Sequence, residues 1–520
     1  MNVLNSLPSV VVIELGSQYT LLIERSLREI GIRSVILDPK RASDWFAKNP
    51  VKAVILSGGA ASVYDADAPA PPAGVFSLKH PDGKSVPVLG ICYGMQWIAK
   101  HFGGTVQKTT EHGEYGTTRI TELEEGTNLF KGFEVPGRFR KVWASHGDSV
   151  TEVPPAFIPR ARTASGAIAA MCNHEETVWG VQFHPEVTQT EGGKNMLRQF
   201  MDMGRCRTDW LPSSMVKGIQ TKVARSFPNG KVIFGFSGGV DSTTLAAILV
   251  VVLGNRLIAV IIDGGQLREN ELEEIALHAK IAGVTLRVID ARRQFNEVME
   301  GVTDAGVKRR RFKHIYTECF LKEATLQGAT AVLQGTLAPD RIESGATGGA
   351  NIKEHHNVGL DMGHLLQLHP IDHLFKYEVR ALAREFGLPP SVYDRQPFPG
   401  PGLFLRVVGV PATPDKLDIV RWADARVCEI CKRHGVYSDI SQLLTAYIGT
   451  KTVGVKGDAR AYGGAIVVRG VKTLDFMTAE GYELPSTVRQ EIKSTLGKHP
   501  DIVRVWFDEM DKPPATTEME

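Results

Sequence analysis

The sequence has little of several features that mark particular classes of protein. Its longest uninterrupted apolar run, Leu245 to Leu253, is far shorter than the ~20 residues that a membrane-spanning helix needs. Only six cysteines are scattered through 520 residues, which fits reduced thiols better than a disulfide framework. The 60 Lys and Arg residues nearly balance the 58 Asp and Glu residues, so no charge excess points to a polyanionic partner. These absences argue against a membrane protein, a disulfide scaffold and a bulk nucleic-acid binder.

The N-terminus also lacks the pattern of a secretory signal. No cationic segment precedes its apolar stretch SVVVIEL, and this stretch is too short for a signal followed by a cleavage site. We therefore expect a cytoplasmic protein with no membrane contact. Hydrophobic residues make up 43% and charged residues 23% of the chain, which is an ordinary globular composition. At roughly 100–200 residues per domain, the length predicts two to four domains.

Alternating apolar and amphipathic segments indicate how the chain is divided. In residues 8–202, SVVVIEL, SVILD, KAVIL and VPVLGIC alternate with helix-like segments, as parallel strands with crossover helices do. A second series follows in residues 203–394 with KVIFGF, RLIAVIID, TLRVIDA and ATAVLQG. Residues 395–520 begin with RQPFPGPG, which no helix or central strand tolerates, and then mix strands with a long helical segment. We predict two doubly wound α/β domains with mainly parallel sheets, followed by a smaller α+β domain.

A candidate nucleophile lies in VPVLGICYGMQ, where Cys92 follows an apolar strand and precedes a helical segment. Gly90 and Gly94 flank it, as the tight turn of a nucleophile elbow requires, and a helix N-terminus favours a thiolate. A tight turn around a structural cysteine is the alternative. In VWGVQFHPE, a further strand delivers His184 and Glu186 to the same face. We expect His184 to take the thiol proton and Glu186 to orient the imidazole.

The glycines of SGG at residues 57–59 end another predicted strand and let backbone amides approach a ligand closely. We interpret Gly59 and Tyr93 as the amide donors of an oxyanion hole, an effect of about 3 kcal/mol per donor. With GICYGMQ, SHGD and GVQFHPEVTQT, these residues resemble the class I glutamine amidotransferases. Enzymes of that family hydrolyse glutamine to glutamate and ammonia. The resemblance implies that residues 8–202 form such a domain and that the Cys, His and Glu above are its triad.

A second site is indicated by SGGVDS, between the strand KVIFGF and an apolar helix. A Gly-rich turn at a helix N-terminus cradles phosphate, and no Gly-Lys-Ser/Thr of a Walker loop follows. Two serines would therefore donate to pyrophosphate oxygens, and Asp241 would help to hold Mg²⁺ with ATP; a generic glycine turn is the alternative. The motif resembles the loop of N-type ATP pyrophosphatases, which cleave ATP between its α and β phosphates. The predicted ATP-binding residues are Ser237, Gly238, Gly239, Val240, Asp241, Ser242 and Thr243.

Acidic and basic residues farther along the chain point to further parts of this second site. The next predicted strand ends at Asp263, where we expect the adenosine, because ligands lie at the carboxyl ends of strands in a doubly wound sheet. QGTLAPDRIES and IKEHHNVG contribute Asp340, Glu343 and Lys353 within Gly-rich stretches, which we interpret as a lid over Mg²⁺·ATP. Solvated loop charges are the alternative interpretation.

The order of the domains, with QGTLAPDRIES, HHNVG, PFPGPGL, VKGDAR and KPPATTEME, resembles the glutamine-hydrolysing GMP synthetase family from end to end. The resemblance implies a ligase that aminates xanthosine 5′-monophosphate (XMP) to GMP. The XMP O2 oxygen would attack ATP, pyrophosphate would leave, and ammonia from glutamine would displace AMP. It further implies a homodimer formed through residues 395–520 and no organic cofactor. The implied XMP contacts are Arg309, Lys512 and Glu518, with Arg406 as a further phosphate candidate.

The sequence departs from the usual pattern of this family at several positions, among them Ala60, Gln189, Tyr377, Phe404 and Met519. The last three fall around nucleotide-binding elements, which leaves a paralogue that aminates a related purine nucleotide as an alternative. A non-catalytic nucleotide-binding regulator is a second, although the intact triad and SGGVDS argue against it. A ligase that modifies nucleic acid, such as one that thiolates tRNA, is a third, although the sequence has no basic domain to support it.

Overall fold

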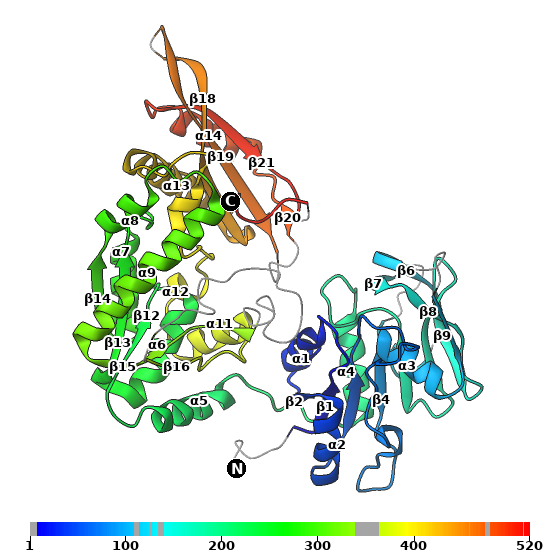
Figure 1. Ribbon diagram of the computed structural model, residues 1–520. Coiled ribbons are helices and arrows are strands. Elements are labelled where there is room, and N and C mark those ends of the chain that lie inside the picture. Colours follow the sequence, from blue (N-terminus) through cyan, green and yellow to red (C-terminus); the bar gives the residue numbers. More distant parts are fainter. Residues whose placement is uncertain are drawn as a thin grey trace. The chain divides into compact units, whose positions relative to one another are not determined.

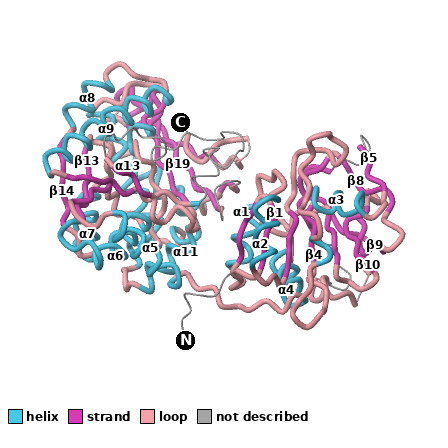
Figure 2. The backbone as a smooth tube through the Cα atoms, turned by 60° about the horizontal axis from the view of Figure 1, so that its bottom comes forward, coloured by secondary structure: helices cyan, strands magenta, loops and turns pink. Residues whose placement is uncertain are grey.

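The computed structural model of the chain describes residues 8–108, 114–124, 126–133, 140–338, 363, 365–456, 458–473, 479–512 and 514–519. These residues form two compact units, one up to Ser214 and one from Met215 onward (Figure 1). Strands and helices alternate along much of both units (Figure 2). In the described part of the chain, no helix is long and apolar enough to cross a membrane. The predicted boundaries at residues 202 and 394 stay predictions.

A sheet of nine described strands organises the first unit, in the order β2-β1-β3-β4-β11-β10-β9-β6-β7. The strands from β2 to β11 run parallel, as predicted, and the remaining strands are joined by antiparallel pairs, which the sequence analysis did not predict. The elements of this unit are β1 (Val10–Ile13), α1 (Thr20–Glu29), β2 (Ser34–Leu37), α2 (Pro39–Lys48), β3 (Ala53–Leu56), β4 (Val88–Ile91), α3 (Tyr93–His101), β5 (Thr105–Lys108), β6 (Glu114–Leu123), β7 (Arg140–His146), β8 (Asp148–Glu152), β9 (Phe157–Thr163), β10 (Ile168–Asn173), β11 (Val178–Val181) and α4 (Gly193–Met203).

Both faces of the parallel strands in this unit are buried. On β1, Val10 and Val12 face one hydrophobic core, while Val11 and Ile13 face the other. Helices α1 and α4 contribute to the first core, and α2 and α3 contribute to the second. A strand that is buried on both sides has no polar face, which is why these strands are continuous apolar runs in the sequence. The doubly wound arrangement predicted for the start of the chain is therefore present.

The second unit begins with a sheet of five described strands, all parallel, in the order β14-β13-β12-β15-β16. Helices α6, α7 and α11 cover one face, and α8 and α9 cover the other (Figure 1). Because the chain moves from β12 first toward β14 and later back to β15, the sheet has its switch point next to β12. The elements are α5 (Ser213–Ser226), β12 (Lys231–Gly235), α6 (Val240–Leu253), β13 (Leu257–Asp263), α7 (Glu271–Ile281), β14 (Thr285–Asp290), α8 (Arg292–Met299), α9 (Ala305–Gln327), β15 (Ala329–Leu333), β16 (Leu366–Leu368), α11 (Lys376–Glu385) and α12 (Pro390–Tyr393).

A third sheet completes the second unit in the order β17-β18-β19-β20, with β21 parallel to β19. Helices α13 and α14 pack against it, as expected for an α+β arrangement. This part of the chain shares a core with the preceding sheet, since Phe404 and Leu417 pack with residues of β12 and β13. Its elements are the 3₁₀ helix η4 (Gly402–Arg406), β17 (Val407–Val408), α13 (Pro414–Arg433), β18 (Gln442–Lys456), β19 (Ala459–Lys472), β20 (Glu480–Gly481), α14 (Ser486–Leu496) and β21 (Ile502–Asp508).

Candidate active sites

The first site is built around Cys92, in the turn between β4 and α3. Its backbone has φ 52° and ψ −107°, a conformation that residues other than glycine rarely adopt. The flanking glycines make this turn possible because the backbone passes too close to its neighbours to leave room for a side chain. A Cβ atom on Gly90 would lie 2.5 Å from the carbonyl of Gly94, and one on Gly94 would lie 2.6 Å from the carbonyl oxygen of Leu56. The turn therefore holds the thiol at the N-terminus of α3, where the helix dipole favours an anion.

His184 and Glu186 form a buried pair in the same unit. The Nδ1 atom of His184 lies 2.7 Å from Oε1 of Glu186, and both residues are at most 5% exposed. Contrary to prediction, they lie beyond the end of β11 rather than on it. After Val181 the backbone leaves the strand, and the amide of His184 donates to the carbonyl of Trp143 on β7.

The electrostatics of this pair suit a base that becomes charged. Burial disfavours the imidazolium, but the Glu186 carboxylate and the Cys92 thiol outweigh burial and hold the pKa of His184 well above its ordinary value. The Cys92 side chain lies close enough to His184 to raise its pKa, and the ring of Tyr19 packs edge-on against the imidazole at 4.9 Å. The structure therefore brings together all three residues of the predicted triad.

The predicted oxyanion-hole residues lie next to each other. A Cβ atom on Gly59 would lie 3.2 Å from Cγ of Tyr93, and one on Gly58 would lie 3.3 Å from Cε1 of His184. The glycine turn after β3 thus packs directly against the elbow and the imidazole. Tyr93 is fully buried, its hydroxyl donates to the carbonyl of Pro69 at 2.7 Å, and burial raises its pKa to about 12.

Two buried glutamines that the sequence analysis did not single out complete the surroundings of the thiol. The Nε2 atom of Gln182 lies 3.7 Å from Sγ of Cys92, and Gln96 contacts Gln182 in turn. Sγ also lies 3.8 Å from the carbonyl oxygen of Ser145, in the SHGD segment. The sequence did contain a signal for Gln182. A polar residue inside the apolar run VWGVQF is expected to be buried, and a buried polar side chain needs a hydrogen-bond partner.

The second site is the turn between β12 and α6. Gly238 has φ 66°, and Gly239 precedes the first residue of α6, so the turn wraps around the N-terminus of a fourteen-residue helix. Ser237 and Ser242 face each other with their Oγ atoms 3.3 Å apart, and the amide of Gly239 donates to Oγ of Ser237. Hydroxyl donors and a helix N-terminus converge here, and such an arrangement is suited to a phosphate ligand. Val240 and Thr243 lie in the first turn of the helix and are buried.

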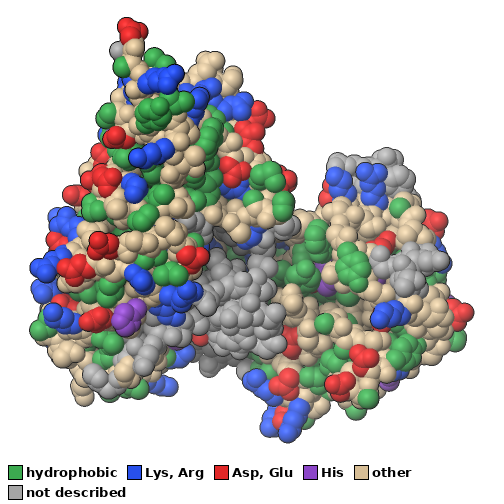
Figure 3. Space-filling model, turned by 45° about the horizontal axis from the view of Figure 1, so that its top comes forward, with side chains coloured by type: hydrophobic (Ala, Val, Ile, Leu, Met, Phe, Trp, Pro, Cys, Tyr) green, Lys and Arg blue, Asp and Glu red, His purple; other side chains and the backbone are tan. Residues whose placement is uncertain are grey.

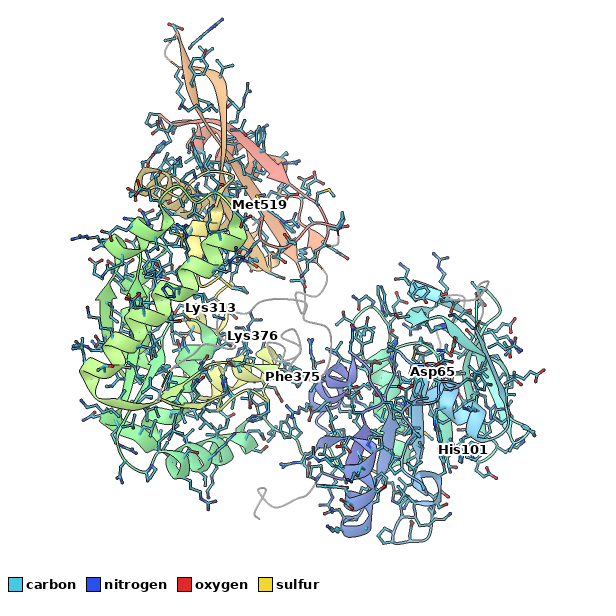
Figure 4. All side chains as sticks on the ribbon, in the orientation of Figure 1. Asp65, His101, Lys313, Phe375, Lys376 and Met519 are labelled. Carbon is cyan, nitrogen blue, oxygen red and sulfur yellow. The ribbon has the colours of Figure 1, made fainter. Side chains whose placement is uncertain are left out.

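In this turn, one carboxylate oxygen of Asp241 forms an ion pair and the other has no hydrogen-bond partner among the described residues. Its Oδ2 atom lies 2.5 Å from Nζ of Lys376, at the first residue of α11, which Figure 4 labels. Its Oδ1 atom is buried and has no hydrogen-bond partner in the described ranges. A free carboxylate oxygen beside a phosphate cradle fits Mg²⁺, which prefers such ligands together with phosphate oxygens. Among the described residues, no cluster of three or more His, Cys, Asp and Glu side chains could hold a metal.

Residues distant in sequence support the glycine turn from behind. Nδ1 of His278 on α7 lies 2.8 Å from the carbonyl oxygen of Gly238, and its Nε2 lies 3.1 Å from Oγ of Ser391. Burial, with the charge of Arg395, lowers the pKa of His278, although the Gly238 carbonyl acts in the opposite direction. A neutral His278 donates to that carbonyl and accepts from the serine. Arg395 reaches the carbonyl of Ser237 and pairs with Glu271.

A cavity of about 380 Å³ opens at the carboxyl end of β13. This volume lies in the range of small-molecule sites, which span roughly 300–1,000 Å³. Asp263, the last residue of β13, lines it, and its Oδ1 accepts from the amide of Gly265 at 2.9 Å. Arg268 and Arg421 also line the cavity, as do residues at the starts of α7 and α8. The predicted place for the adenosine therefore adjoins a cavity, which no residue of the turn at 237–243 lines, and the adenosine position stays a prediction.

The predicted XMP contacts lie in different surroundings. Arg309 is partly buried on α9. Arg406 has no exposed surface: its Nη1 donates to Asp424 at 2.9 Å, and its Nη2 lies 3.5 Å from Glu518. In this structure Arg406 therefore has no surface to offer a ligand phosphate, unlike the prediction. Lys512 pairs with Ala479 through the backbone in both directions.

The end of the chain is packed rather than loose. Glu518 accepts from Nε2 of Gln442 at 2.6 Å, and the buried guanidinium of Arg469 donates to the carbonyl oxygens of Thr516 and Thr517. Met519, labelled in Figure 4, follows this anchored stretch. Three other predicted positions, Asp340, Glu343 and Lys353 of the lid, lie outside the described residues.

Comparison with known proteins gives matches along nearly the whole chain. Family models match for glutamine amidotransferase class I (residues 11–203), NAD synthase (residues 212–314) and the GMP synthase C-terminal domain (residues 429–519). A GMP synthase (glutamine-hydrolyzing) of Pyrobaculum aerophilum is 41% identical over 516 residues, covering 98% of this chain and 99% of the relative. Relatives with the same name from Shewanella woodyi and Thermus thermophilus are 38% and 40% identical, covering 98% of this chain and 98% and 100% of their own lengths.

Proposed function

The chain belongs to the glutamine-hydrolyzing GMP synthase family, and from that premise we propose how its residues divide the reaction between two active sites. It is a ligase that synthesises GMP with glutamine as the amino donor and ATP as a co-substrate. The first unit would release ammonia from glutamine, and the second would activate XMP with ATP. The alternatives of a paralogue with another substrate and of a non-catalytic regulator are not favoured by these relatives.

We assign the glutamine half-reaction to Cys92, His184 and Glu186. His184 would take the thiol proton, and the sulfur would form a bond to the glutamine side-chain carbonyl carbon. The carbon–nitrogen bond then breaks, and His184 returns its proton to the leaving ammonia. Water hydrolyses the resulting thioester to glutamate. The backbone amides of Gly59 and Tyr93 would stabilise the oxyanion, which is supported by the closeness of Gly59 to the side chain of Tyr93.

We assign ATP to the turn and helix start at residues 237–243, with Lys376 as a cation that the sequence analysis missed. Its ammonium contacts Asp241 and is placed to meet phosphate oxygens. Asp241 would hold Mg²⁺ with ATP, and the ion would neutralise phosphate charge when bound. The XMP O2 oxygen would bond to the α-phosphorus as pyrophosphate leaves, and ammonia would then bond to C2 as AMP leaves. The lid residues Asp340, Glu343 and Lys353 stay part of this proposal.

We place XMP between α9 and the anchored end of the chain. Arg309, Lys512 and Glu518 would contact the nucleotide. Arg406 would act through Glu518, which lies 3.5 Å from its guanidinium, rather than by touching the phosphate itself. Support for this placement comes from the tail, whose carbonyls are bound by the buried Arg469 and which is therefore rigid enough to form a binding surface.

We further propose a cytoplasmic homodimer without nucleic-acid or membrane partners. The six cysteines all lie in the described ranges and are free, which suits a reducing compartment. Acidic and basic side chains are interspersed on the face shown in Figure 3, in agreement with the net charge of +2. The hairpin of β18 and β19 exposes Val455 (76%) and Tyr462 (67%), apolar side chains that a second copy could cover. Sedimentation of the protein with and without Val455→Asp tests the dimer.

The observation that carries the functional assignment is the buried triad geometry in one unit together with the phosphate turn in the other. The test is product analysis with XMP and Mg²⁺·ATP, supplying either glutamine or ammonium. We expect GMP, AMP and pyrophosphate from both donors, and glutamate only from glutamine. The Cys92→Ala variant should lose glutamine-driven synthesis and keep ammonium-driven synthesis. Loss of both in a folded variant would overturn the division into two sites.

A further inference from the structure

The side chain of Gln182 lies against the sulfur of Cys92, and the mechanism above does not use it. Gln182 is 3% exposed and Cys92 is 4% exposed, so neither group is solvated by bulk water. The Nε2 atom of Gln182 lies 3.7 Å from Sγ, within hydrogen-bond distance for a sulfur acceptor. An amide hydrogen donated to sulfur favours the thiolate over the thiol, because the thiolate is the better acceptor.

A second buried glutamine determines which end of the Gln182 amide faces the sulfur. Gln96, on α3 and 4% exposed, uses its Nε2 atom twice. It donates to the carbonyl of Asp148 at 2.8 Å and to Oε1 of Gln182 at 3.5 Å. An amide nitrogen has two hydrogens, and both are thereby used. If the Gln182 amide were flipped, two NH₂ groups would face each other and its carbonyl oxygen would face the sulfur. The network therefore selects the orientation in which Gln182 donates to Cys92.

We propose that Gln182 is a catalytic residue of the glutamine half-reaction, donating a hydrogen bond to the Cys92 thiolate, and that Gln96 is the positioning residue that orients it. This inference rests on the proposed role of Cys92 as nucleophile. A thiolate in a site with so little water needs donors from the protein, because burial disfavours its charge. The dipole of α3 and the imidazolium of His184 supply two such interactions, and Gln182 supplies a third.

The same contact acts in the second half of the reaction. When water attacks the thioester, a carbon–oxygen bond forms, the carbon–sulfur bond breaks, and its electron pair returns to sulfur. The proton of the water passes to His184. The amide of Gln182 then stabilises the departing thiolate of Cys92, just as it stabilised the attacking one. A donor that faces sulfur therefore stabilises the negative charge that sulfur carries before attack and regains on departure, whereas a packing role alone would leave the pH dependence of Cys92 reactivity unchanged.

The test replaces Gln182 by Met, which has a similar length and no hydrogen to donate. The rate of Cys92 alkylation by iodoacetamide is followed against pH, without glutamine, by mass spectrometry of the Cys92 peptide. We expect the midpoint of this profile to move up by about one pH unit, which corresponds to one hydrogen bond to a charged group. The kcat for glutamine hydrolysis should fall about tenfold, while KM changes by less than about twofold.

Control variants separate this role from packing. Gln96→Met should move the profile in the same direction by a smaller amount, because Gln182 keeps its donor but loses its fixed orientation. Gln107→Met, on the exposed side of β5, should leave both the profile and kcat unchanged. Circular dichroism and the melting temperature report whether the first unit is folded, since ammonium-driven synthesis reports only on the second. If Gln182→Met does not fold, Gln182→Leu takes its place, as it also lacks a donor.

The outcomes are distinguishable. A folded Gln182→Met or Gln182→Leu variant with the wild-type profile and kcat would overturn the role of Gln182 and leave the triad untouched. Glutamine hydrolysis that survives in Cys92→Ala would instead overturn the proposed function of the first unit. A kcat loss without a shifted profile would also contradict the inference, because it would place Gln182 in substrate binding or packing rather than in thiolate stabilisation.

Discussion

Replacing Glu186 by Gln removes the charge that faces the buried imidazole while keeping the shape of the side chain. The carboxylate lies 2.7 Å from Nδ1 of His184, and neither residue is exposed by more than 5%. In the native pair the carboxylate accepts from Nδ1, which leaves Nε2 free to take the thiol proton. A glutamine can instead present an NH₂ group to Nδ1, which selects the tautomer that cannot act as the base. We therefore expect glutamine hydrolysis to fall strongly.

The magnitude follows from the charges. Two unit charges about 4 Å apart interact by about 4 kcal/mol at an effective dielectric constant of about 20. Desolvation of the buried carboxylate offsets part of this, so that about 2–4 kcal/mol remains for stabilising the imidazolium formed in the reaction. At about 1.36 kcal/mol per tenfold change in rate, Glu186→Gln should lower the kcat for glutamine hydrolysis by roughly 30- to 1,000-fold.

The assay measures glutamate release and GMP formation with each nitrogen donor. Ammonium-driven synthesis should be unchanged in Glu186→Gln, because the phosphate turn lies in the other unit. Glu191→Gln is the matched control: Glu191 lies close by in sequence, and its carboxylate accepts from the backbone amide of Lys141. We expect less than about a twofold effect from it. A Glu186→Gln enzyme that keeps more than a third of wild-type glutamine hydrolysis would refute the electrostatic argument.

The same variant has a pH signature. The folded-state pKa of His184 lies above its unfolded value of 6.5, because the Glu186 charge and the Cys92 thiol outweigh burial. The stability that Glu186 contributes is therefore complete below that value and is lost as the pH rises through the folded pKa. The difference in melting temperature between the wild type and Glu186→Gln should be largest near pH 6 and should shrink on the alkaline side. A difference that grows with pH would contradict the raised pKa.

Three other variants test separate parts of the structure. Lys376→Met should lower synthesis from both nitrogen donors by about 10- to 100-fold, because it removes a cation beside Asp241; unchanged pyrophosphate release would argue against that role. Gly90→Ala would force a Cβ atom to within 2.5 Å of backbone, so calorimetry should show the first unit destabilised by about 1–3 kcal/mol. Arg469→Met should speed hydrogen exchange at residues 515–518 and raise KM for XMP, since the carbonyl of Thr517 loses its donor; protection equal to wild type would contradict the anchoring role.

In the first unit, the parallel strands were predictable from sequence, whereas antiparallel strands such as β6 were not, for a physical reason. Strands β1, β3 and β4 are buried on both faces and leave continuous apolar runs such as VVVI and AVIL. Strand β6 alternates between exposed and half-buried positions, so its sequence EYGTTRITEL has no such run. Its period-two alternation was a usable signal, although a weak one, since its pairing with β7 and β9 depends on residues far along the chain.

The site residues also differ in how far the sequence could predict them. Local motifs pointed to Cys92 and to His184 with Glu186 because each motif carries its own turn chemistry. Lys376 was missed because it lies 135 residues from Asp241, and only the packing of α11 beside α6 brings the two together. Arg406 went the other way: a basic residue after a glycine turn looked like a phosphate ligand, but it is buried against Asp424. Sequence shows which side chains are charged, whereas burial decides whether a ligand can reach them.

The two proposed active sites share the same local arrangement of strand, turn and helix, but its role differs between them. In each, a buried parallel strand ends in a glycine-rich turn, and the next helix begins at the reactive position, with Cys92 before α3 and Gly239 before α6. In both cases the helix N-terminus favours negative charge. At the first site the anion is the thiolate of Cys92 itself. The positive φ therefore occurs at Cys92, and a base is needed beside it to take the thiol proton. At the second the anion arrives with the ligand, so a glycine, Gly238, takes the positive φ, and a cation such as Lys376 stands opposite. In this chain the residue with positive φ is thus the proposed nucleophile in one turn and a glycine in the other.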